Sequence, residues 1–175
     1  MIENIDNMQE LEKDVDKVLK LDADAKKIVL GFTTAATGTG AIPIPFADMP
    51  LLIGEQVAMM SSICALYGIK VKKEGLKMLV IQVLGTGGAS FLGKTVVTNL
   101  LKMIPGAGSF TAGVISAATA GTITLALGFS FIEICNDVKL GKLSEKDMFS
   151  KATARKMKKI FKEELKKNRE GKNES

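Results

Sequence analysis

The segment "AIPIPFADMPLLIGEQVAMMSSICALYG" (residues 41–68) decides the fold class. A proline lacks the backbone N–H and clashes with the preceding turn, so a continuous helix is forbidden where this segment carries Pro43, Pro45 and Pro50. Asp48 is suited to cap a helix that has Pro50 in its first turn, and Gly68 is a natural helix stop. The sequence therefore predicts a Pro-containing turn followed by an apolar helix that ends at Gly68.

Apolar stretches of helical length surround this segment. The only charges between residues 28 and 69 are Asp48 and Glu55, and two further apolar stretches cover residues 78–101 and 103–132. Each half of the chain contains an apolar helix, a turn with an Ile-Pro pair, and a second apolar helix. Hydrophobic residues make up 46% of the chain but aromatic residues only 5%, which favours closely packed helices with small residues at their contacts. We expect an all-α protein built from two helical hairpins with Pro/Gly turns.

Charged helices are expected at both ends of the chain. Residues 2–24 follow the helical period with apolar side chains, and residues 148–165 do the same among many lysines. Ser144 and Asp147 resemble a capping box at the start of the basic helix, which we expect to run to about Lys167. The predicted organisation is an amphipathic N-terminal helix (1–25), a central helical domain (26–142), and a basic C-terminal helix and tail (143–175).

Composition excludes several classes of enzyme. The 175-residue chain has no histidine, which removes His-based acid–base catalysis, His-containing triads and most zinc enzymes. Cys64 and Cys135 lie in apolar runs without motif spacing, so we expect buried free thiols rather than a disulfide. The charged opening sequence is unlike a secretory signal, so the chain is expected to begin in the cytosol. We expect no metal and no cofactor.

One motif points to nucleotide binding. Residues 88–95, "GASFLGKT", match the phosphate-binding P-loop pattern through Gly88, Gly93, Lys94 and Thr95. The flanking segments are long, Gly/Ala-rich and helix-like, whereas a doubly wound sheet alternates strands with helices. No later strand ends in a clear Mg²⁺-binding aspartate. We interpret the match as a coincidence within a helix or turn, and a P-loop NTPase remains an alternative.

Three other positions carry groups capable of chemistry. Glu133 and Asp137 lie four apart on one helix face, where paired carboxylates could act as acid and base, but lysines follow closely and a charged helix end is the simpler interpretation. Glu55 could be a buried ion or proton site, but hydrogen bonding in a capping region or between helices is the simpler interpretation. Tyr67 is expected to anchor a helix end, with its ring buried and its hydroxyl in water. None of these amounts to a catalytic assignment.

The quoted segment, continued to residue 69, also resembles a known family. Pro43, Pro45, Asp48, Tyr67 and Gly68, followed by "LLKMIPGAGS" with Pro105, Gly106 and Gly108, resemble the helical domain of unknown function found after the G domain of bacterial Era/dynamin-like small GTPases and in YcjF-type inner-membrane proteins. The resemblance spans roughly residues 24–140. It implies a bacterial GTPase-associated helical module without catalytic residues, because the family's GTPase activity belongs to a separate domain.

The apolar stretches raise the question of a membrane. The thirty uncharged residues 103–132 exceed the roughly 20 that span a bilayer, and Gly113, Ala117 and Gly121 have the small-xxx-small spacing of packed membrane helices. If each half is a hairpin, the flanking lysines lie on one side, as the positive-inside rule requires. The same patterns suit a soluble helical bundle.

We therefore expect a non-enzymatic module on the cytoplasmic face of the cytoplasmic membrane, with a soluble cytoplasmic interaction bundle as the alternative. The expected partners are membrane lipid, a GTPase-domain protein or both, without nucleic acid, and an oligomer is possible. The basic C-terminal helix is suited either to an anionic membrane surface or to docking on its own domain.

Overall fold

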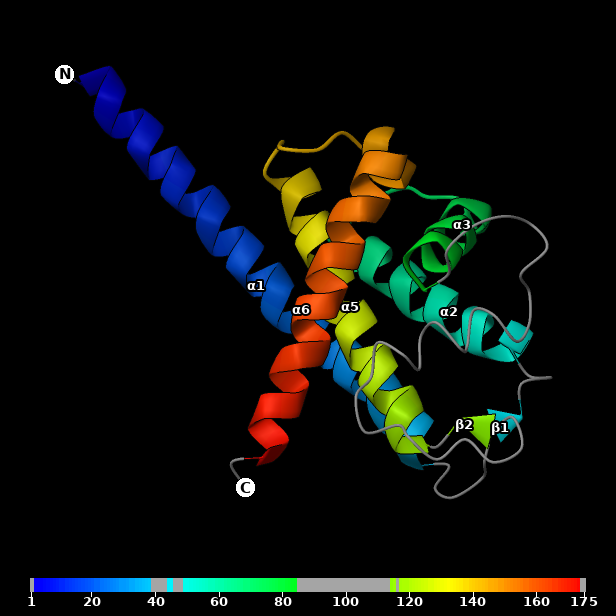
Figure 1. Ribbon diagram of the computed structural model, residues 1–175. Helices are drawn as coiled ribbons and strands as arrows, with labels where there is room; N and C mark the ends of the chain where they lie inside the picture. The colour runs from blue at the N-terminus through cyan, green and yellow to red at the C-terminus, as the bar shows by residue number, and fades with distance from the viewer. Residues whose placement is uncertain (1, 39–43, 46–48, 85–113, 116, 174–175) are drawn as a thin grey trace.

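A computed structural model describes residues 2–38, 44–45, 49–84, 114–115 and 117–173 (Figure 1). In these ranges the protein is all-α, as predicted. The helices are α1 (Ile2–Gly38), α2 (Met49–Tyr67), α3 (Lys73–Leu84), α5 (Ala117–Lys139), the short 3₁₀ helix η2 (Asp147–Phe149) and α6 (Lys151–Asn173). Two-residue strands β1 (Ile44–Pro45) and β2 (Val114–Ile115) pair antiparallel and join the two halves of the chain.

α1 is one continuous helix, whereas the sequence predicted a helix that ends at residue 24. The prediction relied on a change from charged to apolar residues, but a change in polarity does not break a backbone. The charged turn instead supports the helix, because Lys26 Nζ lies 2.7 Å from Asp22 Oδ2 and Lys27 Nζ lies 2.8 Å from Asp24 Oδ1. The boundary between an N-terminal helix and a central domain at residues 25 and 26 stays a prediction.

α2 ends where the sequence predicts. Gly68 has a φ of +70°, a left-handed conformation that L side chains rarely adopt. The N–H of Gly68 donates to the carbonyl of Ala65 at 3.2 Å, and that of Ile69 donates to the carbonyl of Cys64 at 2.9 Å. Pro50 lies in the first turn of α2, as expected, while Asp48 lies outside the described residues.

The basic C-terminal helix begins later than predicted. Ser144 and Asp147 do form the expected local pair, with Ser144 Oγ donating to Asp147 Oδ2 at 2.7 Å and accepting from the Asp147 N–H at 3.2 Å. That pair initiates η2, not α6. The cap of α6 is Ser150, whose Oγ accepts from the N–H of Thr153 at 3.1 Å.

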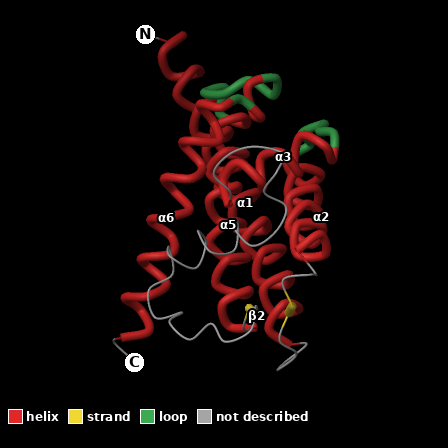
Figure 2. The backbone as a smooth tube through the Cα atoms, turned by 45° about the vertical axis from the view of Figure 1, so that its right-hand side comes forward, coloured by secondary structure: helices red, strands yellow, loops and turns green. Residues whose placement is uncertain are grey.

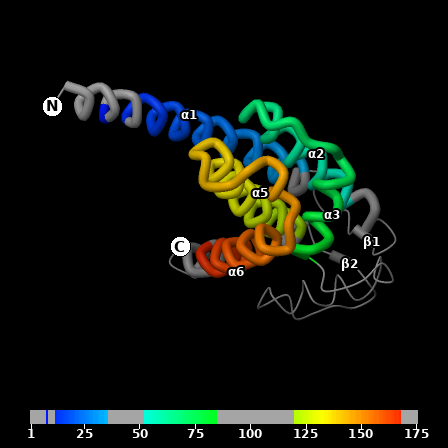
Figure 3. The backbone as a smooth tube through the Cα atoms, turned by 90° about the horizontal axis from the view of Figure 1, so that it is seen from above, coloured from blue at the N-terminus to red at the C-terminus, as the bar shows by residue number. Residues whose placement is uncertain are grey.

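α5 lies at the centre of the bundle. It packs against α1, α2 and α6, and Figure 2 and Figure 3 show these helices around it. Where α5 faces Val29 of α1, a Cβ placed on Gly128 would lie 2.5 Å from Val29 Cγ2, so only glycine permits this approach. The largest fully buried side chains include those of Phe131, Phe161, Leu52, Met59, Met60 and Ile63. The first predicted hairpin corresponds to α1 and α2, and the predicted turn of the second, at Pro105, lies outside the described residues.

Candidate functional site

A chain of hydrogen bonds connects three helices near the end of α2. Tyr67 Oη donates to Asn136 Oδ1 at 2.6 Å, and Asn136 Nδ2 donates to Asp22 Oδ1 at 3.0 Å. Tyr67 is 2% exposed, so its ring is buried as predicted, whereas its hydroxyl, expected in water, bonds to Asn136. The sequence analysis missed Asn136, whose only signal was an amide near the end of an apolar helix.

Burial raises the pKa of two side chains in this region, Tyr67 and Cys135. It raises the pKa of the Tyr67 hydroxyl, and the nearby Cys135, Asp22 and Glu133 raise it further. Burial also raises the pKa of the Cys135 thiol, which hydrogen-bonds with Cys64. Both cysteines are free and buried, as predicted. The raised pKa values keep the Tyr67 phenol and the Cys135 thiol protonated, and neither is an activated nucleophile.

Lysines gather at the end of the bundle where α2 meets α3 and α5 meets α6. Figure 2 shows these two loops at the same end, opposite β1 and β2. Residues 68–78 and 139–151 carry three acidic residues and eight lysines: Lys70, Lys72, Lys73, Lys77, Lys139, Lys142, Lys146 and Lys151. All of these lysines are exposed. We call this region the lysine end.

One side of the bundle, formed by residues 28–35 of α1 and 52–69 of α2, is nearly free of charge. Among the described side chains of residues 28–35 and 52–69, Glu55 is the only charged one. Some of the hydroxyls here bond to their own helices: Thr34 Oγ1 donates to the Leu30 carbonyl at 2.9 Å, and Ser62 Oγ donates to the Ala58 carbonyl at 3.0 Å. Such bonds satisfy hydroxyl groups without water. We call the side chains of residues 28–35 and 52–69 that are not buried the uncharged surface.

Two neighbouring polar residues of α2, Glu55 and Gln56, differ in burial. Glu55, considered as a buried ion or proton site, is exposed, so the interpretation as a buried site is wrong. Its neighbour Gln56 is 1% exposed and donates through Nε2 to Thr124 Oγ1 at 2.9 Å. The Gln56 Oε1 atom has no hydrogen-bond partner among the described residues. The pair ties α2 to α5 inside the apolar core.

The paired carboxylates of α5 lie at a charged helix end. Asp137 forms an ion pair with Lys156 of α6, and Glu133 is exposed. Asp137 thus connects two helices. Within the described ranges, no group of three or more His, Cys, Asp or Glu residues could hold a metal ion.

α6 buries its apolar face in its own domain. Met157 and Phe161 are fully buried, and Leu165 is 6% exposed. The helix packs against α5 and α3, with Met148 buried just before it. The sequence allowed this face either to contact a membrane surface or to dock on its own domain, and in the structure it docks on its own domain.

One described helix is long and apolar enough to cross a membrane. It is the Ala120–Lys139 portion of α5, of which 61% is buried inside the protein. The core helix of a soluble bundle meets the same criteria of length and composition.

Several predicted motif positions cannot be placed. Residues of the P-loop match and of the Pro-containing motifs lie outside the described residues: Gly88, Gly93, Lys94, Thr95, Pro43, Pro105, Gly106 and Gly108. Pro45 is in β1. The interpretation of "GASFLGKT" as a coincidence stays a prediction.

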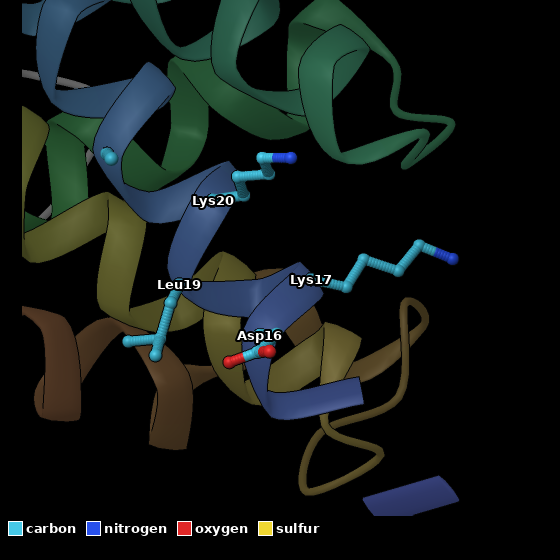
Figure 4. A pocket seen from close by; sticks show the side chains of 5 residues that line it. Asp16, Lys17, Leu19 and Lys20 are labelled. Carbon is cyan, nitrogen blue, oxygen red and sulfur yellow. The ribbon is translucent and has the colours of Figure 1, made fainter. Parts of the chain in front are cut away.

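An open hollow lies beside the projecting part of α1. It is lined by Asp16, Lys17, Leu19, Lys20 and Ala23 (Figure 4). In Figure 4 the Leu19 side chain points away from those of Lys17 and Lys20, so apolar and basic groups occupy different faces of the helix.

Comparison with known proteins agrees with the helical fold. The chain is 29% identical, over 113 residues, to "Magnetosome membrane protein 22" of Magnetospirillum gryphiswaldense, which covers 64% of this chain and 57% of the relative. The chain thus matches little more than half the length of that protein. No solved structure matches. The family model for the "Domain of unknown function (DUF697)" matches residues 6–170. The predicted resemblance to a helical domain of unknown function is therefore confirmed, and the chain belongs to the DUF697 family.

Proposed function

We propose that this protein is a non-enzymatic, membrane-associated helical module. The observation that carries the proposal is the uncharged surface, where Glu55 is the one charge among the described side chains of residues 28–35 and 52–69. Soluble proteins usually interrupt such surfaces with charges, about a quarter to a third of surface positions. An uncharged surface with internally bonded hydroxyls suits contact with lipid, where water is absent to satisfy polar groups.

The charge distribution supports one orientation. With the uncharged surface in the hydrocarbon, the lysine end lies in the cytoplasm, in agreement with the positive-inside rule. The Lys139 ammonium, 3.5 Å from the Tyr67 carbonyl, then lies at the water boundary together with the polar connection of Tyr67 and Asn136. The relative named as a membrane protein supports the location. The protein would occupy the cytoplasmic face of the cytoplasmic membrane.

The module would act with a partner, and a small GTPase is the partner class that we propose. The support is the resemblance of the Pro-containing motifs and of Tyr67 and Gly68 to domains that follow bacterial G domains. A helical module with a lipid-facing end and a charged cytoplasmic end could hold such a GTPase at the membrane.

Fractionation of the full chain tests the membrane proposal. We expect the protein to stay in the membrane pellet through washes with high salt and then alkaline carbonate. Ala58→Lys adds a charge to an exposed position of the uncharged surface and should shift the protein toward the soluble fraction. Met78→Lys is the matched control on α3, where Met78 is 54% exposed outside that surface, and should leave the distribution unchanged.

Release of the unmodified chain in buffer, without detergent, would contradict the proposal and favour the soluble interaction bundle. The third candidate, a P-loop NTPase, predicts Mg²⁺-dependent binding of ATP or GTP that Lys94→Ala abolishes. We expect no such binding.

A further inference from the structure

The N-terminal part of α1 extends away from the bundle. Figure 1 shows it beyond the other helices, and the described side chains of residues 12–17 are all exposed. The first buried side chain among those described in α1 is Val18. We call residues 2–20 the arm.

The arm carries an apolar stripe that the described part of the chain leaves uncovered. Met8, Val15 and Leu19 follow helical spacing on one face and are 70%, 42% and 60% exposed. Glu12 and Asp16, four residues apart, line one edge of this stripe. Lys13, Lys17 and Lys20 follow the opposite face, in agreement with the directions of Lys17 and Leu19 in Figure 4. The arm thus presents an apolar stripe beside carboxylates.

α6 carries the complementary surface. Its outward face has a row of exposed basic residues at helical spacing, Arg155, Lys159, Lys162 and Lys166. The α6 lysines with an ion pair in the described part of the chain are Lys156 and Lys167, which pair with Asp137 and Glu164. The basic row is therefore available to another molecule.

The arm and α6 carry net charges of opposite sign. The arm contains six acidic residues and three lysines, whereas α6 contains ten basic and three acidic residues. Pairing of two arms would place Glu12 and Asp16 of one copy near those of the other, and like charges repel. Lysine stems, in contrast, can lie along an apolar stripe while their ammonium groups reach carboxylates at its edge.

We propose that the arm docks on the α6 basic row of a second copy of this chain. Reciprocal docking, arm on α6 in both directions, produces a closed two-fold dimer. The inference goes beyond membrane association and does not depend on it, because the arm and the basic row are separate from the uncharged surface.

The test is the mass of the full chain in solution, or in detergent micelles, by light scattering after size exclusion. We expect a dimer at tens of micromolar protein. Leu19→Glu should weaken dimerisation at least tenfold, and Lys17→Glu, on the opposite face of the arm, is the matched control and should leave it unchanged. Circular dichroism checks that each variant keeps its helical content.

Charge reversal identifies the docking surface. Glu12→Lys with Asp16→Lys should abolish the dimer, as should Lys159→Glu with Lys162→Glu. The variant that combines all four changes should dimerise again, because the arm of one copy and the basic row of the other then carry opposite charges once more. A monomer at every concentration, or a dimer that these variants leave unchanged, would overturn the proposal.

Discussion

The arm of α1 and the helix α6 are both amphipathic, and they use their apolar faces in opposite ways. In α6, Met157 and Phe161 are completely buried against the bundle, while in the arm Met8 and Leu19 are mostly exposed. The periodicity of the two segments in the sequence is the same kind of pattern. Amphipathicity therefore indicates an apolar face, but only the packing around the helix determines whether the same chain covers that face.

The largest expected difference between the two helices is in stability. Phe161→Ala removes a fully buried ring from the core and should lower the free energy of unfolding by about 3–5 kcal/mol. Leu19→Ala, at an exposed position, should change it by less than about 0.5 kcal/mol. Chemical denaturation of each variant, at concentrations where all are monomeric, measures both values. Equal losses of unfolding free energy in the two variants would show that the arm packs on its own bundle. The contrast between the arm and α6 would then not hold.

A second prediction concerns the packed half of α1, which contrasts with the arm of the same helix. Gly128→Ala places a methyl group 2.5 Å from Val29 Cγ2, so α1 and α5 must separate, at a cost of about 1–3 kcal/mol. Gly54→Ala is the control, since a Cβ there meets nothing within 4 Å, and it should be neutral or stabilising. Denaturation midpoints distinguish the two variants. Val29→Ala combined with Gly128→Ala should recover part of the loss, and no recovery would argue against direct contact.

The third prediction concerns the place where the arm leaves the bundle. Asp22 accepts a hydrogen bond from Asn136, which in turn accepts one from Tyr67, so this connection fixes α1 just after the arm ends. Tyr67→Phe removes one partly buried hydrogen bond and should cost about 0.5–1.5 kcal/mol. The check is denaturation of Tyr67→Phe, Asn136→Ala and the double variant. If the two losses add without interaction, the connection does not act as a unit.

Sequence reasoning succeeded where the cause is local and missed what depends on distant residues. Gly68 ends α2 because a left-handed residue is needed there, and glycine supplies it. Ser144 and Ser150 offer equivalent caps, and the choice between them depends on burial of Met148 and on the contact of the Phe149 ring with Gly75. That contact lies far from the caps in sequence.

Among the candidate functional residues, too, the local features were predicted and the long-range contacts were missed. The lysine-rich loops were evident from composition, and their common location followed from the predicted hairpins. Asn136 could not be connected with Tyr67 and Asp22, because the bonds join residues 69 and 114 positions apart. The exposure of Glu55 and the burial of Gln56 depend on the orientation of α2 against α5, which a short apolar pattern does not determine.

The smallest expected effect is a pH dependence at the junction between the arm and the bundle. The folded protein raises the pKa of Tyr67 above its ordinary value near 10, through burial first and through Cys135, Asp22 and Glu133 second. Below pH 10 both states keep the phenol proton, so Tyr67 adds no pH dependence. Above pH 10 the unfolded chain loses this proton while the folded chain keeps it, so stability falls as pH rises. Tyr67→Phe should show a shallower alkaline fall in the free energy of unfolding, narrowing its difference from the unmodified chain between pH 9 and 11. Parallel curves would mean that the hydroxyl reaches water in the folded state, and the arm would then leave the bundle without a buried polar anchor.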